Sequence, residues 1–194
     1  MRKLRVLLNT SPTQYARRVG VMVINRHMLS KKDIKRLMNE VPWLSEVYGS
    51  IDEAEVIKVN DNLEIYRIMN DAALVKAVVN INNSSMNLTY PTLLAANKYP
   101  SLVRHYPVVQ VDDGAVKPIA TGADVMRPGI RELIGSFKPG DIVLVKSPGE
   151  RIIAVTVSLY SSDEVINMSR GKVLKNIHHV DDEVWRLMSE VHEH

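Results

Sequence analysis

The sequence contains no cysteine among its 194 residues. Disulfide bonds and thiolate metal sites are therefore excluded, and the absence fits a reducing compartment. No apolar run approaches the length that spans a bilayer, and the charged start Arg2-Lys3-Leu4-Arg5 is followed by an apolar stretch far too short for a signal peptide. We therefore expect a cytoplasmic protein.

Motifs of catalytic sites are equally scarce. The chain has no phosphate-cradling glycine loop, no Gly-x-Ser-x-Gly elbow and no His-Glu-x-x-His helix. Asp112, Asp113 and Asp124 could surround a metal ion, but Asp112-Asp113-Gly114 is more simply a turn that caps a helix. We therefore expect no enzyme, no cofactor and no metal.

The neighbouring histidines His178 and His179 do not change this expectation. Adjacent residues of a strand face opposite sides, so the two rings cannot hold one ion together. His178 is expected to make a structural hydrogen bond instead.

Net charge is small, at +3, but it is unevenly distributed. The first fifty residues carry ten lysines and arginines and three acidic residues, whereas the remainder is mildly acidic. Attraction to phosphate would therefore be concentrated at the N-terminal end.

A helix is predicted after Ser30, because Ser30 and Asp33 resemble a capping box and apolar residues recur at i, i+3, i+4 and i+7 up to Val41. Pro42 closes it. Before this helix, the sequence favours a strand at Lys3–Asn9 and a buried apolar run at Val19–Ile24. The polar helix face carries Lys31, Lys32, Lys35 and Arg36. This cluster is either an RNA-binding face or a solvated surface.

Strand patterns follow from Glu55. Val56–Val59 and Leu63–Ile68 read as a hairpin, and Ala72–Val79 could add a third strand. The polar stretch Ile81–Asn87 is expected to be a loop. A short helix is expected from Tyr90, with Pro91 in its first turn.

A compact unit begins at Val109. The sequence pattern there predicts a strand, the Asp112–Gly114 turn, a brief helix that stops at Thr121-Gly122, and a second strand ending at Pro128-Gly129. Gly114 and Gly122 are positions where the backbone can take positive φ or another molecule can approach closely. Such a unit leaves little room for an active-site cleft and favours binding.

Two further strands are predicted at Asp141–Val145 and Ile152–Tyr160. In the second, apolar and polar residues alternate, so one face should be buried and the other solvated. Ser161 should cap a short helix that ends at Gly171, and Lys172–Val180 should form the closing strand.

In this order the motifs resemble the PUA domain, a small mixed β-barrel found in RNA-modifying enzymes and translation-associated proteins. The similarity extends through Gly140–Val145, Ile153–Val155, Gly171-Lys172, Asn176–His178 and Asp181–Trp185. The resemblance implies an α+β chain. A mixed α/β pre-PUA domain would occupy residues 1–105, and a PUA mixed β-barrel with short helices would occupy residues 106–194.

Motifs in the first half of the chain make the resemblance more specific within PUA-containing proteins. A helix and hairpin, then Pro91-Thr92-Leu93 and Lys98-Tyr99-Pro100 before the PUA-like part, are similar to archaeal pre-PUA plus PUA proteins and to the malignant T-cell-amplified sequence and ligatin family. The resemblance implies binding of tRNA or rRNA and association with the small ribosomal subunit during initiation, reinitiation or recycling. It also implies a partner like density-regulated protein, which carries the zinc in that pairing.

The resemblance further implies an RNA-binding surface on the first helix, the following strand and the closing strand. Lysine and arginine would contact phosphates, and glycine would let RNA approach the backbone. Lys117 and Arg127 are the favoured contacts, whereas Val125 and Met126 are expected to pack in the core. The full set is Lys117, Thr121, Gly122, Ala123, Asp124, Arg127, Lys172 and Lys175.

Three functions are compatible with the sequence. The first is a non-catalytic RNA-binding translation factor, and the second is a targeting module for an RNA-modification enzyme supplied in trans. The third is a metal-dependent enzyme acting on nucleotides, which would need Asp112 or Asp124 as a ligand.

Overall fold

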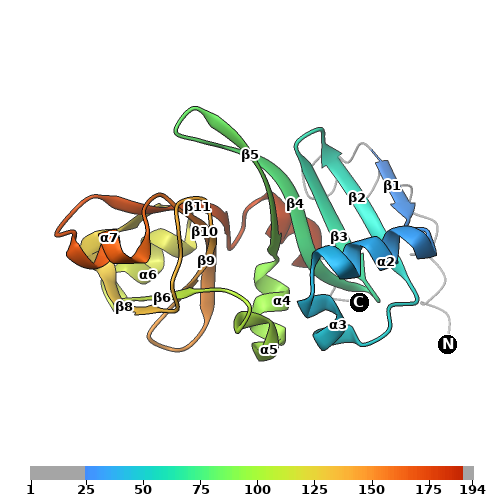
Figure 1. The fold of residues 1–194 in the computed structure, drawn as a ribbon, viewed down its shortest axis with the longest axis horizontal. Coiled ribbons are helices and arrows are strands. Elements are labelled where there is room, and N and C mark those ends of the chain that lie inside the picture. The colour runs from blue at the N-terminus through green and yellow to red at the C-terminus, as the bar shows by residue number, and fades with distance from the viewer. Residues whose placement is uncertain (1–24, 190–194) are drawn as a thin grey trace, which may run out of the picture.

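The computed structural model describes residues 25–189, which form two β-sheets joined by two short helices (Figure 1). The predicted strand at Lys3–Asn9 and the apolar run at Val19–Ile24 lie outside these residues. The first sheet has strand order β1-β2-β3-β4-β5, and every neighbouring pair is antiparallel. Its strands are β1 (Asn25–Met28), β2 (Ala54–Asn60), β3 (Leu63–Ile68), β4 (Asp71–Ile81) and β5 (Ser84–Pro91). The β2–β3 hairpin and the third strand are therefore confirmed.

Helix α2 (Lys31–Glu40) confirms the predicted capped helix. The Ser30 side chain accepts a hydrogen bond from the Asp33 backbone N–H, which satisfies one of the free donors of the first turn. Ile34 and Leu37 are buried against the first sheet. The chain then turns at Pro42 into α3 (Trp43–Tyr48), which the sequence patterns did not predict.

The predicted loop at Ile81–Asn87 is wrong. β4 continues to Ile81, and Asn82 and Asn83 form a two-residue turn with φ of 47° and 66° before β5 starts at Ser84. Asparagine tolerates this left-handed backbone and favours tight hairpin turns. The strand was missed because the polar residues on its exposed side outweighed the alternating apolar signal of Met86, Leu88 and Tyr90.

The predicted helix start at Tyr90-Pro91 is also wrong, because both residues end β5. β5 is the last strand of its sheet, where proline's missing N–H is tolerated. Thr92 caps α4 (Leu93–Lys98), accepting from the Ala95 backbone N–H, and α5 (Pro100–Val103) follows.

The second sheet has strand order β7-β11-β10-β9-β6-β8 and curls around its own core as a mixed sheet. The β6–β9 pair is parallel, and its other pairs are antiparallel. Its elements are β6 (Val108–Val111), α6 (Asp113–Ala120), β7 (Val125–Met126), the 3-10 helix η2 (Arg127–Gly129), β8 (Ile130–Ile134), β9 (Ile142–Lys146), β10 (Ile152–Ser158), α7 (Ser162–Asn167), β11 (Lys172–His179) and α8 (Glu183–Ser189). The α+β fold class and the curled second sheet agree with the sequence prediction.

The strand predicted to end at Pro128-Gly129 is shorter than expected. It stops at Met126 because η2 follows, and a further strand, β8, begins at Ile130. β8 was missed since Arg131 and Glu132 are exposed and give no alternating apolar signal. The closing strand β11 and the Ser161 cap of α7 are confirmed, but the predicted helix end at Gly171 is wrong, because α7 ends at Asn167.

The predicted solvated face of β10 is wrong, because all seven residues of the strand are buried. Val155 and Val157 pack in the core that includes the first sheet, whereas Ile153 and Ala154 pack inside the second sheet. The Thr156 hydroxyl is satisfied by the Val143 carbonyl at 2.7 Å. The first half of the chain therefore covers the face of Val155 and Val157, and the face that the alternating pattern assigned to water is buried as well at Thr156 and Ser158.

Polar contacts join the two halves at the same place. The Leu93 backbone N–H donates to Nε2 of His178 at 3.1 Å, and Nδ1 of His178 lies 2.7 Å from the Asp182 carboxylate. The predicted structural hydrogen bond of His178 is thus confirmed. α8 returns to the first half, where Val184, Leu187 and Met188 join its core. Among residues 25–189, no helix is both long and apolar enough to cross a bilayer.

Candidate nucleic-acid interface

A ridge formed by the end of α6, the following turn, β7 and β11 carries most of the predicted RNA-binding residues. Asn176 on β11 holds this ridge together. Its side-chain amide donates to the carbonyls of Ile119 and Ala123 at 2.9 and 3.0 Å, and its backbone N–H donates to Asp124. The Thr121–Ala123 turn and Asp124 are therefore fixed against β11.

Asp124 also pairs with the two lysines of β11. Its carboxylate lies 2.6 Å from Nζ of Lys172 and 3.9 Å from Nζ of Lys175. Partial burial alone would raise the pKa of Asp124, but hydrogen bonds from Lys172 and the Asn176 backbone and the charge of Lys175 lower it overall. The carboxylate stays ionised at neutral pH, so the cluster has one net positive charge.

Gly122 is required by the fold of this turn. Its φ is +103°, and a Cβ placed there would lie 2.7 Å from Nε2 of His179. The space beside Gly122 is therefore occupied by a side chain of the same molecule. Gly114, by contrast, lies within helix α6 and its φ is not positive, so the expected left-handed backbone occurs only at Gly122 of these two.

The two favoured cations differ in their surroundings. Lys117 is exposed on α6. The guanidinium of Arg127 is half-buried: Nε donates to the Val165 carbonyl at 2.7 Å, and NH1 lies 3.5 Å from the Ile130 carbonyl. Arg127 thus ties η2 to α7, whereas Lys117 remains available to a ligand.

The expectation for the apolar pair on β7 is half right. Val125 is fully buried, as expected for core packing. Met126 is 49% exposed, which contradicts that expectation. The short strand alternates between the core and solvent, and Met126 falls on the solvent side beside Lys172, its partner in the β7–β11 register.

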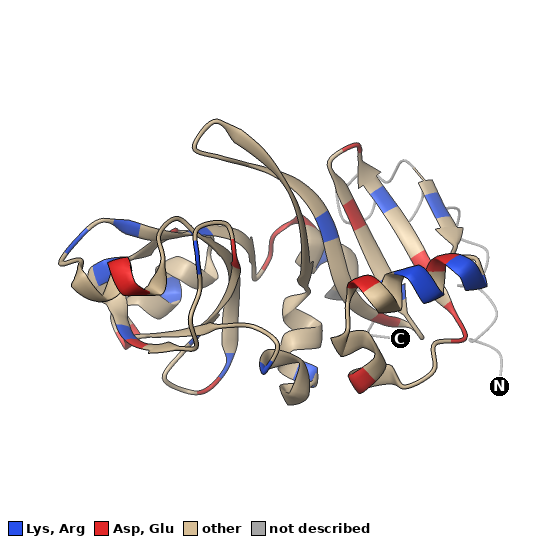
Figure 2. Ribbon diagram, viewed as in Figure 1, with Lys and Arg blue, Asp and Glu red and all other residues tan. Residues whose placement is uncertain are grey.

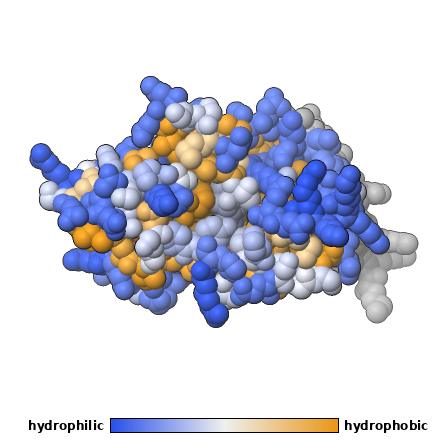
Figure 3. Space-filling view, in the orientation of Figure 1, coloured by the Kyte–Doolittle hydropathy of each residue, from blue (hydrophilic) through white to orange (hydrophobic). Residues whose placement is uncertain are grey.

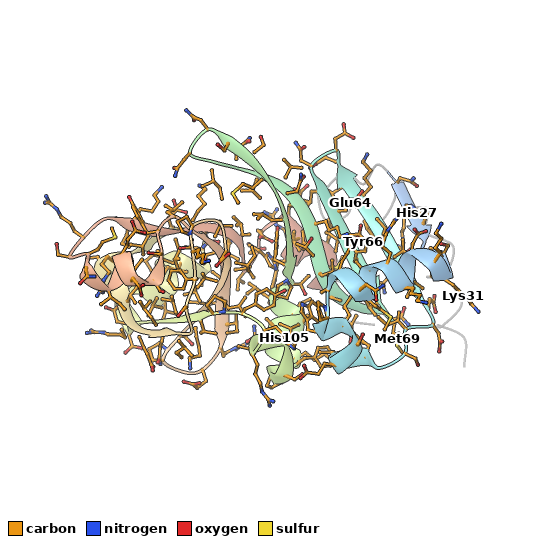
Figure 4. The ribbon with its side chains drawn as sticks, in the orientation of Figure 1. His27, Lys31, Glu64, Tyr66, Met69 and His105 are labelled. Carbon is orange, nitrogen blue, oxygen red and sulfur yellow. The ribbon has the colours of Figure 1, made fainter. Side chains whose placement is uncertain are left out.

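A second basic surface lies on α2. Lys31, Lys32, Lys35 and Arg36 are all exposed, and the region is visibly basic and hydrophilic (Figures 2 and 3). Figure 4 shows Lys31 at the start of α2, extending away from the first sheet. Arg36 is paired with Asp33 at 2.9 Å. The three lysines are therefore the cations of this surface that remain open to phosphate.

The aspartates that could have suggested a metal have other roles. Asp112 caps α6, with its carboxylate accepting from the Ala115 backbone N–H at 2.9 Å, so the capping interpretation is confirmed. Asp124 is bound to lysine. In the described part of the chain, no three histidine, aspartate or glutamate side chains converge as metal ligands would.

Sequence reasoning missed the organising role of Asn176. Its amide makes main-chain bonds to two positions more than fifty residues away, which no local pattern reveals. The Asn176-Ile177-His178 motif was the available signal, because an asparagine and a histidine within an apolar strand both need buried partners.

Comparison with known proteins places these features in context. The PUA domain model matches residues 107–180. An uncharacterized protein of Methanocaldococcus jannaschii is 32% identical over 165 residues, covering 82% of this chain and 94% of the relative. Malignant T-cell-amplified sequence 1 of Rattus norvegicus is 25% identical, covering 75% of this chain and 77% of the relative.

Two further similarities extend the comparison. Translation machinery-associated protein 20 of Saccharomyces cerevisiae is 24% identical, covering 80% of this chain and 86% of the relative. The solved structure of a conserved PUA domain protein from Thermoplasma acidophilum superimposes with a TM-score of 0.67 at 26% identity. It covers 84% of this chain and 99% of that one.

Proposed function

Because the chain belongs to the family of PUA-domain proteins that includes the malignant T-cell-amplified sequence proteins, we propose that it is a non-catalytic RNA-binding factor of the translation apparatus. The observation that carries this proposal is the PUA match at residues 107–180, in a chain whose yeast relative is named for its association with the translation machinery. The ligand is tRNA or rRNA, and the site of action is the small ribosomal subunit.

We propose a division of labour between the two halves. Residues 106–194 hold structured RNA on the ridge, where Lys117, Lys172 and Lys175 contact phosphates and the Thr121–Asp124 segment positions them. Residues 1–105 contact the subunit through the basic surface of α2, with a protein like density-regulated protein as a further partner. The exposed lysines of both surfaces support this assignment.

Arg127 has a supporting role in this proposal. Its side chain bonds to main-chain carbonyls, so it shapes the ridge between β7 and α7 and contacts RNA only with whatever part of the guanidinium stays free.

The test is affinity purification of the tagged full-length chain from its own cells at low salt, after crosslinking, with sequencing of the attached RNA. Recovery of small-subunit rRNA or tRNA supports the proposal. Recovery of an RNA-modification enzyme without ribosomal subunits would select the targeting-module alternative instead. Binding at the ridge predicts that the attached RNA is reduced when Lys117, Lys172 and Lys175 are replaced by glutamine.

A further inference from the structure

The β4–β5 hairpin extends beyond the rest of the first sheet. The ladder between β3 and β4 ends at the Leu63–Ala77 pair, whereas β4 and β5 remain paired as far as Ile81 and Ser84. We call residues 78–87 the arm. Figure 1 shows it projecting past the ends of β2 and β3 and over the second sheet.

The arm is held in place and does not depend on a ligand for its shape. Ile81 near the tip is only 8% exposed and belongs to the shared core. The Met86 side chain lies against Gly140 in the turn before β9, where a Cβ on Gly140 would come within 2.7 Å of Met86 Cε. The Ser85 hydroxyl bonds across the hairpin to the Asn80 side chain at 2.6 Å.

The surface of the arm is polar and uncharged. No charged residue occurs between Lys76 and Lys98, although 24% of the whole chain is charged. The exposed polar residues of the arm are Asn80, Asn82, Asn83, Ser84, Ser85 and Asn87. The turn conformation explains Asn82 and Asn83. The bond across the hairpin accounts for one group each of Asn80 and Ser85. Neither accounts for Ser84 and Asn87, and edge strands are ordinarily protected by charged residues.

This chemistry identifies the kind of partner. Protein interfaces depend on buried aromatic and apolar anchors, and Val78 is the one large apolar side chain that the arm exposes. Amide and hydroxyl groups without carboxylates suit RNA, because they bond to 2′-hydroxyls and base edges and do not repel phosphate. A two-stranded arm also fits the wide, shallow minor groove of an RNA helix.

The arm is placed to act together with the ridge. Val78 and Val79 line the same groove, of about 640 Å³, as Gly122 and Asn176. Asp61, Asp182 and Glu183 also line this groove, so phosphates are expected on the lysines of the ridge and not inside the groove. An RNA on the ridge would therefore cross toward the arm above the groove.

We propose that the arm is a second RNA-contacting element, which bonds to sugars and bases of the RNA whose phosphates lie on the ridge. This inference rests on the proposed function. It adds a contact that is neutral, so it contributes affinity without releasing counterions.

The test compares the full-length chain with the triple variant Asn80→Ala, Ser85→Ala, Asn87→Ala, which keeps the Asn82-Asn83 turn and removes both partners of the Ser85–Asn80 bond. Unfractionated tRNA is the probe, in filter binding between 50 and 200 mM salt. We expect the triple variant to bind about tenfold more weakly, since each lost neutral hydrogen bond contributes modestly. The slope of log affinity against log salt should stay unchanged. The control, Ser45→Ala with Ser50→Ala, changes exposed residues of α3 and the loop after it and should bind normally.

Wild-type affinity in the triple variant would overturn the inference while leaving the proposed function intact. A flatter salt slope would also overturn it, because the arm would then contact phosphates. Normal tRNA binding with lost subunit association would also overturn the proposed contact with tRNA and would assign the arm to a contact with the subunit. If the unaltered chain itself fails to bind tRNA at 50 mM salt, the inference falls together with the tRNA part of the proposed function.

Discussion

At the scale of single residues, the ridge shows that neighbouring candidates in the sequence can have opposite roles. Lys117 is exposed, whereas Arg127 donates to two main-chain carbonyls. Sequence patterns identify both as cations but cannot distinguish their roles, because the carbonyl of Val165 lies next to Arg127 only in the folded chain. The same holds for Asp124, which anchors lysines and the Asn176 backbone.

This difference predicts separable effects of two charge reversals. Lys117→Glu should weaken tRNA binding severalfold and leave the melting temperature unchanged. Arg127→Glu should lower the melting temperature by several degrees, because losing hydrogen bonds from a charged, half-buried group costs about 1.5–3 kcal/mol. Thermal unfolding and filter binding measure the two effects. Equal melting temperatures for both variants would contradict the structural role of Arg127.

Gly122 provides a second residue-scale prediction. Gly122→Ala should destabilise the fold by about 1–3 kcal/mol, because its φ of +103° is strained for alanine and the new Cβ would meet the His179 ring. Gly114→Ala is the matched control, since Gly114 is helical and has no close neighbour beyond a 3.5 Å contact. It should be neutral or stabilising by up to about 1 kcal/mol. Urea unfolding of both variants is the measurement, and equal stability would refute the requirement for glycine at Gly122.

At the scale of elements, the sequence predicted those helices whose capping residues lie next to them in the chain. Ser30 with Asp33 located α2, and Ser161 with Glu164 located α7, because a cap and its helix are adjacent in sequence. β5 and β8 were missed because each is an end strand of its sheet with polar or charged exposed residues. Strand identity there depends on a partner strand, which the sequence does not display locally.

The basic surface of α2 gives an element-scale prediction. Reversing Lys31, Lys32, Lys35 and Arg36 to glutamate should reduce association with the small ribosomal subunit. Its salt dependence should also flatten, by about 0.9 in slope for each lost phosphate contact. Cosedimentation at several salt concentrations measures both. Unchanged association would identify this surface as a solvated helix face.

At the scale of the whole molecule, one core connects both halves of the chain. The proposed division near residue 105 separates the two sheets, yet α8 returns to the first half and β10 is covered by it. Sequence alternation predicted a buried face for β10 but not that the first half of the chain covers it, because the covering residues are distant in the chain. The PUA-like order of motifs was recognisable, but the contacts between the halves were not. A structural hydrogen bond was expected of His178, but not its partner Leu93 in the first half.

The contacts of Asp182 with His178 and with backbone N–H groups predict that the fold loses stability at low pH. Burial alone would raise the pKa of Asp182, but His178 and the backbone N–H groups of Trp185 and His179 lower it overall. A folded-state pKa below the unfolded value of about 3.9 means that the stabilisation is present above that pH and is lost as pH falls through the folded value.

Asp182→Asn should therefore destabilise the chain at pH 7 by about 2 kcal/mol and reduce the fall in stability below about pH 4. Asp181→Asn is the control, because the Asp181 side chain is 83% exposed and its pair with Arg186 spans 3.7 Å. Urea unfolding between pH 3 and 7 provides the comparison. If both variants followed the same pH profile, Asp182 would not link the halves as described.

RNA binding at the ridge is tested by measuring the affinity of the full-length chain for tRNA and for small-subunit rRNA as a function of salt. The comparison is with the variant in which Lys117, Lys172 and Lys175 are glutamine. We predict measurable binding at 50 mM salt that weakens steeply as salt rises, and a variant with lower affinity and a shallower slope. Absence of binding to either RNA, or a variant with the same affinity and slope as the unaltered chain, would contradict this prediction.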